Sequence, residues 1–150
     1  MEIRNLARKD IPESAELLMR AYNGAPWNEQ WSLEPAKRYL CEFADHTRFV
    51  GVAVFEKGHM VGAAFCHKKT WWTNDELFVD EFFIEPASQR KGYGEALLAY
   101  IEGYIRTQGL AGFTLLTNRN MPALAFYRKH GFVDAEHVVF LYKMVSGHMP

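Results

Sequence analysis

Cysteine is scarce in this 150-residue sequence, which contains only Cys41 and Cys66. Two thiols do not make a disulfide framework, and the six histidines do not have the spacing of a zinc site. Long apolar runs are also missing, and residues 1–4 lack the charged-then-apolar pattern of a signal peptide. We therefore expect a cytoplasmic protein with free thiols, no metal and no membrane partner.

An excess of charge of one sign is likewise missing. Lys and Arg number 17, Asp and Glu number 18, and the net charge is -1, which gives no general attraction to nucleic acid. The length and the 49% hydrophobic content predict a single domain spanning residues 1–150 with its own core. Aromatic residues are plentiful at 15%, and the tryptophans form two pairs, Trp27/Trp31 and Trp71/Trp72.

Hydrophobic periodicity and turn residues predict an α/β fold. The expected order is strand, two helices, three strands, helix, strand, helix, two strands. Such an order predicts one mixed, mostly antiparallel sheet with helices on both faces. The expected strands are Glu2–Leu6, Phe49–Glu56, Met60–His67, Leu77–Ile84, Phe113–Thr117, Phe132–Val133 and Val138–Met144. The expected helices follow Asp10, Ser32, Gly94 and Asn120, the last with Asn120 as its N-terminal cap.

The segment from Gln89 to Gly94 lies between a predicted strand and a predicted helix. Glycine lets the backbone approach a ligand closely, and the first turn of a helix offers free N–H groups and the positive end of a dipole. This combination favours an anion site, usually for phosphate. The segment lacks the third glycine of a dinucleotide fingerprint and the Gly-Lys-Ser/Thr of a nucleotide loop. A plain strand-to-helix turn explains the segment equally well when it is taken alone.

A second motif runs from Asn120 to Phe132 and includes Ala123, Tyr127 and Gly131. Together the two motifs resemble those of the GNAT superfamily of acyl-CoA-dependent N-acyltransferases, closest in pattern to members acting on small amines, polyamines or aminoglycosides. The first motif there is Gln/Arg-x-x-Gly-x-Gly/Ala, and the second is Asn…Ala-x-x-Phe/Tyr-Tyr-x-x-x-Gly-Phe. The resemblance covers nearly the whole chain and implies acetyl-CoA as co-substrate.

The resemblance also implies where the coenzyme binds. The backbone of Phe82, Phe83 and Ile84 would pair with the pantetheine arm, and Asn120 would bind the pantetheine or cysteamine end. Tyr127 would protonate the departing thiolate, although a half-buried aromatic with a bonded hydroxyl is the plainer interpretation. The amides from Arg90 to Glu95 would hold the pyrophosphate. The cofactor-binding residues implied in this segment are Gln89, Arg90, Lys91, Gly92, Tyr93, Gly94 and Glu95.

Asp80 and Glu81 interrupt an otherwise apolar strand, where a charge is costly without a partner. The acceptor amine must lose a proton, and a nearby carboxylate can take it, directly or through water. In a regular strand the two side chains point to opposite faces, unless a bulge intervenes. On the resemblance to polyamine-type members, Asp80 ranks first as base and Glu81 second; a structural ion pair is the alternative. Leu115 stands where some members carry a glutamate base, so a glutamate at this position cannot remove the proton from the amine.

Aromatic rings beside carboxylates suit a cationic amine, although packing explains them as well. We therefore expect the acceptor pocket to include Trp27, Glu29, Trp31, Trp71, Trp72 and Asp80. The resulting hypothesis is transfer of an acetyl group from acetyl-CoA directly to a primary amine of a small cationic acceptor. The alternatives are a protein or peptide amine and a non-catalytic acyl-CoA-binding module. Homodimers are common among the relatives, and the final predicted hairpin offers an edge for pairing.

Overall fold

The computed structural model describes residues 1–148. Five strands and four α-helices follow one another in the order expected as far as the last helix. Two short 3₁₀ turns, Arg8–Asp10 and Pro86–Ser88, precede helices. The elements are β1 (Glu2–Asn5), α1 (Ile11–Asn23), α2 (Leu33–Ala44), β2 (Phe49–Glu56), β3 (His59–Lys69), β4 (Glu76–Ile84), α3 (Tyr93–Gln108), β5 (Phe113–Leu115) and α4 (Pro122–Lys129).

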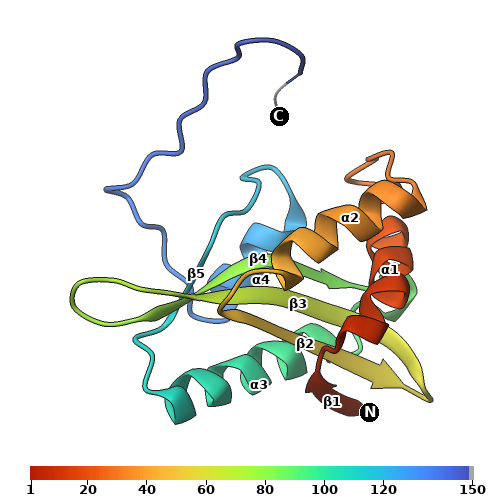
Figure 1. The fold of residues 1–150 in the computed structure, drawn as a ribbon, viewed down its shortest axis with the longest axis horizontal. Helices are drawn as coiled ribbons and strands as arrows, with labels where there is room; N and C mark the ends of the chain where they lie inside the picture. Colours follow the sequence, from red (N-terminus) through yellow and green to blue (C-terminus); the bar gives the residue numbers. More distant parts are fainter. Residues whose placement is uncertain (149–150) are drawn as a thin grey trace.

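The strands form one sheet in the order β1-β2-β3-β4-β5, antiparallel except for the parallel pair β4–β5. Helices α1 and α2 cover one face of the sheet, and α3 lies against the other (Figure 1). Each face has its own core, one centred on Leu17, Leu40 and Phe65 and the other on Leu97 and Ile101. The predicted mixed sheet with helices on both faces is therefore confirmed.

Two irregularities in β4 shape the centre of the sheet. Phe65 of β3 pairs with Glu81, but the next residue, Cys66, pairs with Val79, so Asp80 is the extra residue of a β-bulge. On its other side β4 pairs with β5 only from Leu77 to Val79. Beyond Val79 the two parallel strands have no paired residues in the described part of the chain. This opening between β4 and β5 positions the site.

The predicted hairpin of strands at Phe132–Val133 and Val138–Met144 is wrong. Residues 132–148 contain no strand, and the segment leaves the body of the molecule (Figure 1). Its apolar residues are continuous from Val138 to Tyr142, a pattern typical of strands covered on both faces. No second layer of the described chain covers this segment, and β5 offers an edge of only three residues.

Within residues 1–148, no helix is both long and apolar enough to cross a membrane.

Candidate active site

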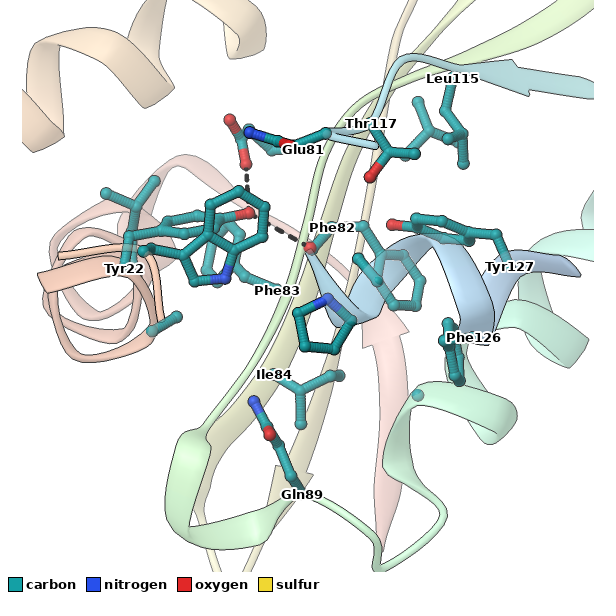
Figure 2. A pocket seen from close by; sticks show the side chains of 18 of the residues that line it. Tyr22, Glu81, Phe82, Phe83, Ile84, Gln89, Leu115, Thr117, Phe126 and Tyr127 are labelled. Atoms are coloured by element: carbon teal, nitrogen blue, oxygen red, sulfur yellow. Dashed lines mark hydrogen bonds between the residues drawn. The ribbon is translucent and has the colours of Figure 1, made fainter. Parts of the chain in front are cut away.

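A cavity of about 1200 Å³ lies where β4 and β5 diverge. One wall is β4 from Val79 to Ile84 and the facing wall is the segment from Leu115 to Arg119, with the first turns of α3 and α4 closing the end. Helices α1 and α2 border the opposite side. A volume above the usual range for one drug-sized ligand leaves room for two substrates to meet. Figure 2 shows Tyr22 and Glu81 on one side of β4 and Phe126 and Tyr127 on the other.

The β5-facing edge of β4 is open in the half of the strand that lines the cavity. Phe82, Phe83 and Ile84 pair with Ala64, Ala63 and Gly62 of β3, and the described residues place no strand along their other side. Backbone N–H and C=O groups at such an edge need partners. An extended ligand carrying amide groups can supply them by strand addition.

The glycine segment forms a left-handed turn directly before α3. Arg90 and Gly92 have φ values of +69° and +83°, and Gly92 is the residue preceding the helix, which begins at Tyr93. A Cβ at Gly92 would meet no atom within 4 Å, so the space beside this backbone is open. The first-turn amides of α3 have no acceptor within the helix. The turn thus presents N–H groups and the positive helix end to the cavity, as an anion site requires.

Several of the expected residues in this turn line the cavity, namely Gln89, Arg90, Gly92, Tyr93, Gly94 and Glu95. Lys91 is exposed and does not line it. Tyr93 lines the cavity, but its hydroxyl donates to Glu56 of β2 at 2.8 Å, so the Tyr93 side chain anchors α3 to the sheet. A Cβ on Gly94 would lie 3.0 Å from the ring of Phe126, so this glycine allows α3 and α4 to pack closely.

Tyr127 is a buried residue of α4 that lines the cavity. Its ring packs edge-on against Phe82 at 5.9 Å and against Phe132 at 5.3 Å between centroids. Burial raises the pKa of the Tyr127 hydroxyl, and the negative charge of Glu81 raises it further. The hydroxyl is therefore protonated at neutral pH and is able to donate a proton to a group within the cavity.

Asn120 lies outside the cavity, contrary to expectation. The residue is exposed, and its backbone N–H donates to the Asn118 side chain at 2.8 Å. Helix α4 begins at Pro122 with Met121 as its N-terminal cap, so the predicted cap at Asn120 is wrong. Asn118 and Arg119 line the cavity instead. The Asn118 turn displaces Asn120, and local sequence alone does not reveal such a turn.

The bulge at Asp80 brings both acidic side chains to the face of α1 and α2. Asp80 Oδ2 lies 2.7 Å from His67 Nδ1, and the His67 ring stacks on His46 at 4.4 Å between centroids. Glu81 pairs across from Phe65, whose side chain belongs to the core beneath α1 and α2. In a regular strand the two carboxylates would point to opposite faces of the sheet. Because of the bulge, both point to the same side of the cavity.

Glu81 is held by two tyrosines from different helices. The Tyr22 hydroxyl of α1 donates to Glu81 Oε1 at 2.9 Å, and the Tyr39 hydroxyl of α2 donates to Oε2. Burial raises the pKa of Glu81 to about 7, against the lowering effect of the Tyr39 and Tyr22 hydrogen bonds; the charges of Glu29 and Asp80 add to the increase. A carboxylate with a pKa near 7 is matched to proton transfer at neutral pH.

No sequence motif indicates that Tyr22, Tyr39 or His67 belongs to this site. Both tyrosines lie at helical spacing among apolar residues, which is the pattern of core positions. Their polar role depends on where α1 and α2 place them against β4, and no local motif signals it.

The two tryptophan pairs have different positions. Trp27 and Trp31 line the cavity with Glu29, whose carboxylate accepts from Trp31 Nε1 at 2.7 Å. Trp71 and Trp72 are 55% and 86% exposed in the β3–β4 loop, which projects away from the body (Figure 1). Their predicted place in the pocket is wrong because β3 extends to Lys69 and carries the loop past the cavity. The described residues contain no group of three or more His, Cys, Asp or Glu side chains able to hold a metal.

A model of the Acetyltransferase (GNAT) family matches residues 12–132. The chain therefore belongs to this family, whose members use acetyl-CoA as co-substrate, and the assignment made from the two sequence motifs is confirmed.

Two kinds of relative are similar in sequence. A streptothricin acetyltransferase from Streptomyces lavendulae is 32% identical over 92 residues, which are 61% of this chain and 47% of that protein. The chain thus spans about half the length of that relative. The [ribosomal protein bS18]-alanine N-acetyltransferase of Escherichia coli is 27% identical over 135 residues, covering 89% of this chain and 81% of the relative.

Solved structures share the fold. An aminoglycoside acetyltransferase from an uncultured soil metagenomic sample, in complex with sisomicin, superimposes with a TM-score of 0.77 at 18% identity, covering 97% of this chain and 96% of that one. The aminoglycoside antibiotic 6'-N-acetyltransferase from Acinetobacter haemolyticus gives 0.75 at 15% identity, covering 97% and 100%. At these identities the likeness establishes the architecture only.

Proposed function

We propose that this chain transfers an acetyl group from acetyl-CoA to the primary amine of a small cationic acceptor. The observation that carries the proposal is the half-buried Glu81, fixed by Tyr22 and Tyr39 at a cavity that the open edge of β4 borders. The edge and the α3 turn supply groups for an amide-containing, phosphate-bearing donor. Glu81 supplies a base with a pKa of about 7 on the acceptor side.

Each side chain has a distinct role in the proposed reaction. The acceptor enters as an ammonium ion near Glu81, Glu29 and the rings of Trp27 and Trp31. Glu81 removes one proton from the nitrogen, directly or through water, and the neutral amine attacks the thioester carbon. The C–N bond forms, the C–S bond breaks, and the hydroxyl of Tyr127 donates its proton to the leaving sulfur. The nitrogen, positively charged after the attack, gives up its surplus proton, directly or through water, to the Tyr127 phenolate, which leaves a neutral amide and restores the hydroxyl. No covalent bond to the enzyme is needed.

The structure favours Glu81 over Asp80 as the base. Asp80 is already engaged by His67, whereas both hydrogen bonds to Glu81 come from neutral hydroxyls. Burial keeps the pKa of Glu81 high enough for it to bind a proton at neutral pH. We assign Asp80 and Glu29 to attraction of the cationic acceptor. This assignment reverses the ranking expected from the sequence.

A peptide amine is the second candidate acceptor, because the similarity to the bS18-alanine N-acetyltransferase extends over 89% of the chain. The test is release of free thiol from acetyl-CoA in the presence of polyamines, aminoglycosides, streptothricin and short peptides. We expect small polyamines or aminosugars to accelerate release. Acceleration by peptides alone would replace the proposed acceptor. Bound acetyl-CoA with no release by any amine would leave a binding module and overturn the catalytic proposal.

A further inference from the structure

His130, at the C-terminal end of α4, has a ring nitrogen without a hydrogen bond. Its Nε2 atom is shielded from solvent and bonds to no residue of the described chain. Buried polar atoms nearly always have partners, so one that lacks a partner needs an explanation. The Oε1 atom of Glu95, in the first turn of α3, lies 3.5 Å from this nitrogen, within reach of an ion pair when the histidine carries a proton. The two side chains therefore connect α4 to the start of α3.

Packing fixes the His130 ring next to the glycine turn. The ring lies 4.7 Å from that of Phe126 between centroids. Phe126 in turn packs against Gly94, where a Cβ would lie 3.0 Å from the phenyl ring. His130 is thus held beside the first turn of α3, the proposed anion site.

Charged groups around His130 come from its own helix and from α3. On α4, Arg128 pairs with Asp134 at 2.6 Å, and Lys129 lines the cavity. On α3, the group that faces the ring is Glu95. Among the described residues it is the only acidic group within 4.0 Å of a His130 ring nitrogen. The charge of His130 therefore acts first on Glu95.

Glu95 occupies a position from which a carboxylate can block the anion site. Gly92 precedes α3, so Glu95 is the third residue of the helix. A glutamate at this position can reach back to the backbone N–H of the residue before the helix, forming a capping box. This chain uses the same contact elsewhere, since Asp10 accepts from the Ala7 N–H at 2.8 Å at the first 3₁₀ turn. Glu95 and a phosphate group therefore compete for the Gly92 amide.

At α3 this capping contact does not form. In the described structure no side-chain hydrogen bond caps the helix, and the Glu95 carboxylate lies beside His130 instead. The other acidic residues that line the cavity are on the acceptor side, so among the described residues Glu95 is the one carboxylate at the donor end. A carboxylate there opposes a pyrophosphate both by occupying an amide and by like-charge repulsion.

We propose that His130 is a positioning residue for donor binding. In its protonated form it holds the Glu95 carboxylate away from the Gly92 amide and neutralises its charge, which leaves the α3 turn free for the pyrophosphate of coenzyme A. This role rests on the donor site of the proposed function. Histidine changes charge between about pH 5 and pH 8, so the ion pair is present on the acid side of this range and is lost on the alkaline side. Donor affinity should therefore fall as the pH rises.

The expected effect is modest because the Glu95 side chain is 56% exposed and solvent screens the pair. Calorimetric binding of dephospho-coenzyme A at pH values of about 6 and 8 measures it. This probe keeps the pyrophosphate but lacks the phosphate monoester, which itself changes charge near pH 6. His130→Gln keeps a polar side chain that is never charged. We expect it to bind the probe about two- to fivefold more weakly than the unmodified chain at the lower pH, and equally well at the higher pH.

A matched control is available at another histidine. His137 is exposed and does not line the cavity. His137→Gln should therefore bind the probe as the unmodified chain does at both pH values.

Glu95→Gln distinguishes an effect through Glu95 from packing or from direct contact with the ligand. The residue is exposed, so the substitution leaves the fold intact. Without the competing carboxylate, the probe should bind at least as tightly as it binds the unmodified chain at the lower pH. Adding His130→Gln to this variant should have no further effect. Because binding is tighter at lower pH, it takes up a fraction of a proton, which calorimetry in two buffers of different ionisation enthalpy detects. This uptake should disappear in each single variant.

Three results would each overturn the role of His130. They are equal affinities of His130→Gln and the unmodified chain at the lower pH, a loss of the same size in the Glu95→Gln background, and proton uptake that persists in Glu95→Gln. None of them touches the proposed acetyl transfer, which thiol release from acetyl-CoA measures separately. Failure of the unmodified chain to bind acetyl-CoA would overturn the donor site and the role of His130 together.

Discussion

The two sides of the cavity are built in different ways. The donor side, comprising the open edge of β4 and the α3 turn, consists of consecutive residues whose backbone groups face the cavity. The acceptor side brings Glu81 of β4 together with Tyr22 of α1 and Tyr39 of α2, so that residues 59 and 42 positions apart share hydrogen bonds. Local backbone geometry therefore determines the first side, and packing of helices on the sheet determines the second.

Replacing the proposed base should have the largest effect on activity. Glu81→Gln keeps the size of the side chain but removes its ability to take a proton, so we expect kcat/KM for the amine to fall about 10³-fold, within the usual range for a general base. Affinity for acetyl-CoA, measured by calorimetry, should change little because Glu81 lies on the acceptor side. Asp80→Asn is the matched control and should have the smaller effect. The reverse order would restore Asp80 as the base.

Tyr127→Phe tests the residue that lies between the two sides. The variant keeps the packing on Phe82 but removes the proton donor, so kcat should fall roughly 100-fold with little change in coenzyme affinity. Stopped-flow measurement of thiol release isolates the chemical step. An unchanged rate would remove Tyr127 from the mechanism and leave it a packing residue.

Gly94→Val tests the donor side alone. The new side chain would overlap the ring of Phe126 and push the first turn of α3 away from α4. Overpacking of about 1–3 kcal/mol corresponds to roughly 5- to 150-fold weaker binding of acetyl-CoA if the turn is displaced. Gly103→Ala on the same helix meets no atom within 4 Å and is the control. Thermal unfolding of both variants distinguishes weaker binding from a general loss of stability.

The pH dependence tests the acceptor side more finely. Because the pKa of Glu81 is about 7, its charged fraction, and with it kcat/KM, should fall about tenfold from pH 8 to pH 6. The Tyr39 hydrogen bond lowers this pKa, so Tyr39→Phe should move the break in the profile to higher pH. Titration of the amine contributes equally to every variant, and Glu81→Gln should lose the break. A break that Tyr39→Phe leaves in place would argue against Glu81 as its source.

The smallest expected effect separates the two tryptophan pairs. Trp27 lines the cavity and packs on Tyr22 at 5.2 Å between centroids, so Trp27→Leu should raise KM for the amine several-fold through loss of ring-face attraction to the cation. Trp72→Leu, in the exposed β3–β4 loop, should leave KM unchanged. An equal rise in both variants would return the loop to the acceptor site.

Prediction from the sequence succeeded where the signal was local. The Lys57-Gly58 turn between β2 and β3 shows why, since φ values of +52° and +80° at consecutive residues form the hairpin that its glycine indicated. Prediction from the sequence failed at residues 132–144, because their β-rich pattern predicts strands but does not show which surface would cover them. It also failed at Trp71 and Trp72, because composition does not reveal how far β3 and β4 carry their loop from the cavity.

The sequence by itself determined the family, the order of elements as far as α4 and the glycine turn before α3, because these depend on periodicity and on backbone angles that few residues adopt. Only the tertiary structure decided that Asp80 and Glu81 share a face, since one unpaired residue in the β3–β4 register rotates every side chain that follows it. The same packing brought Tyr22 and Tyr39 to Glu81. The pKa near 7 that suits this carboxylate to catalysis is therefore a property of the assembled layers, and no single segment of the chain contains it.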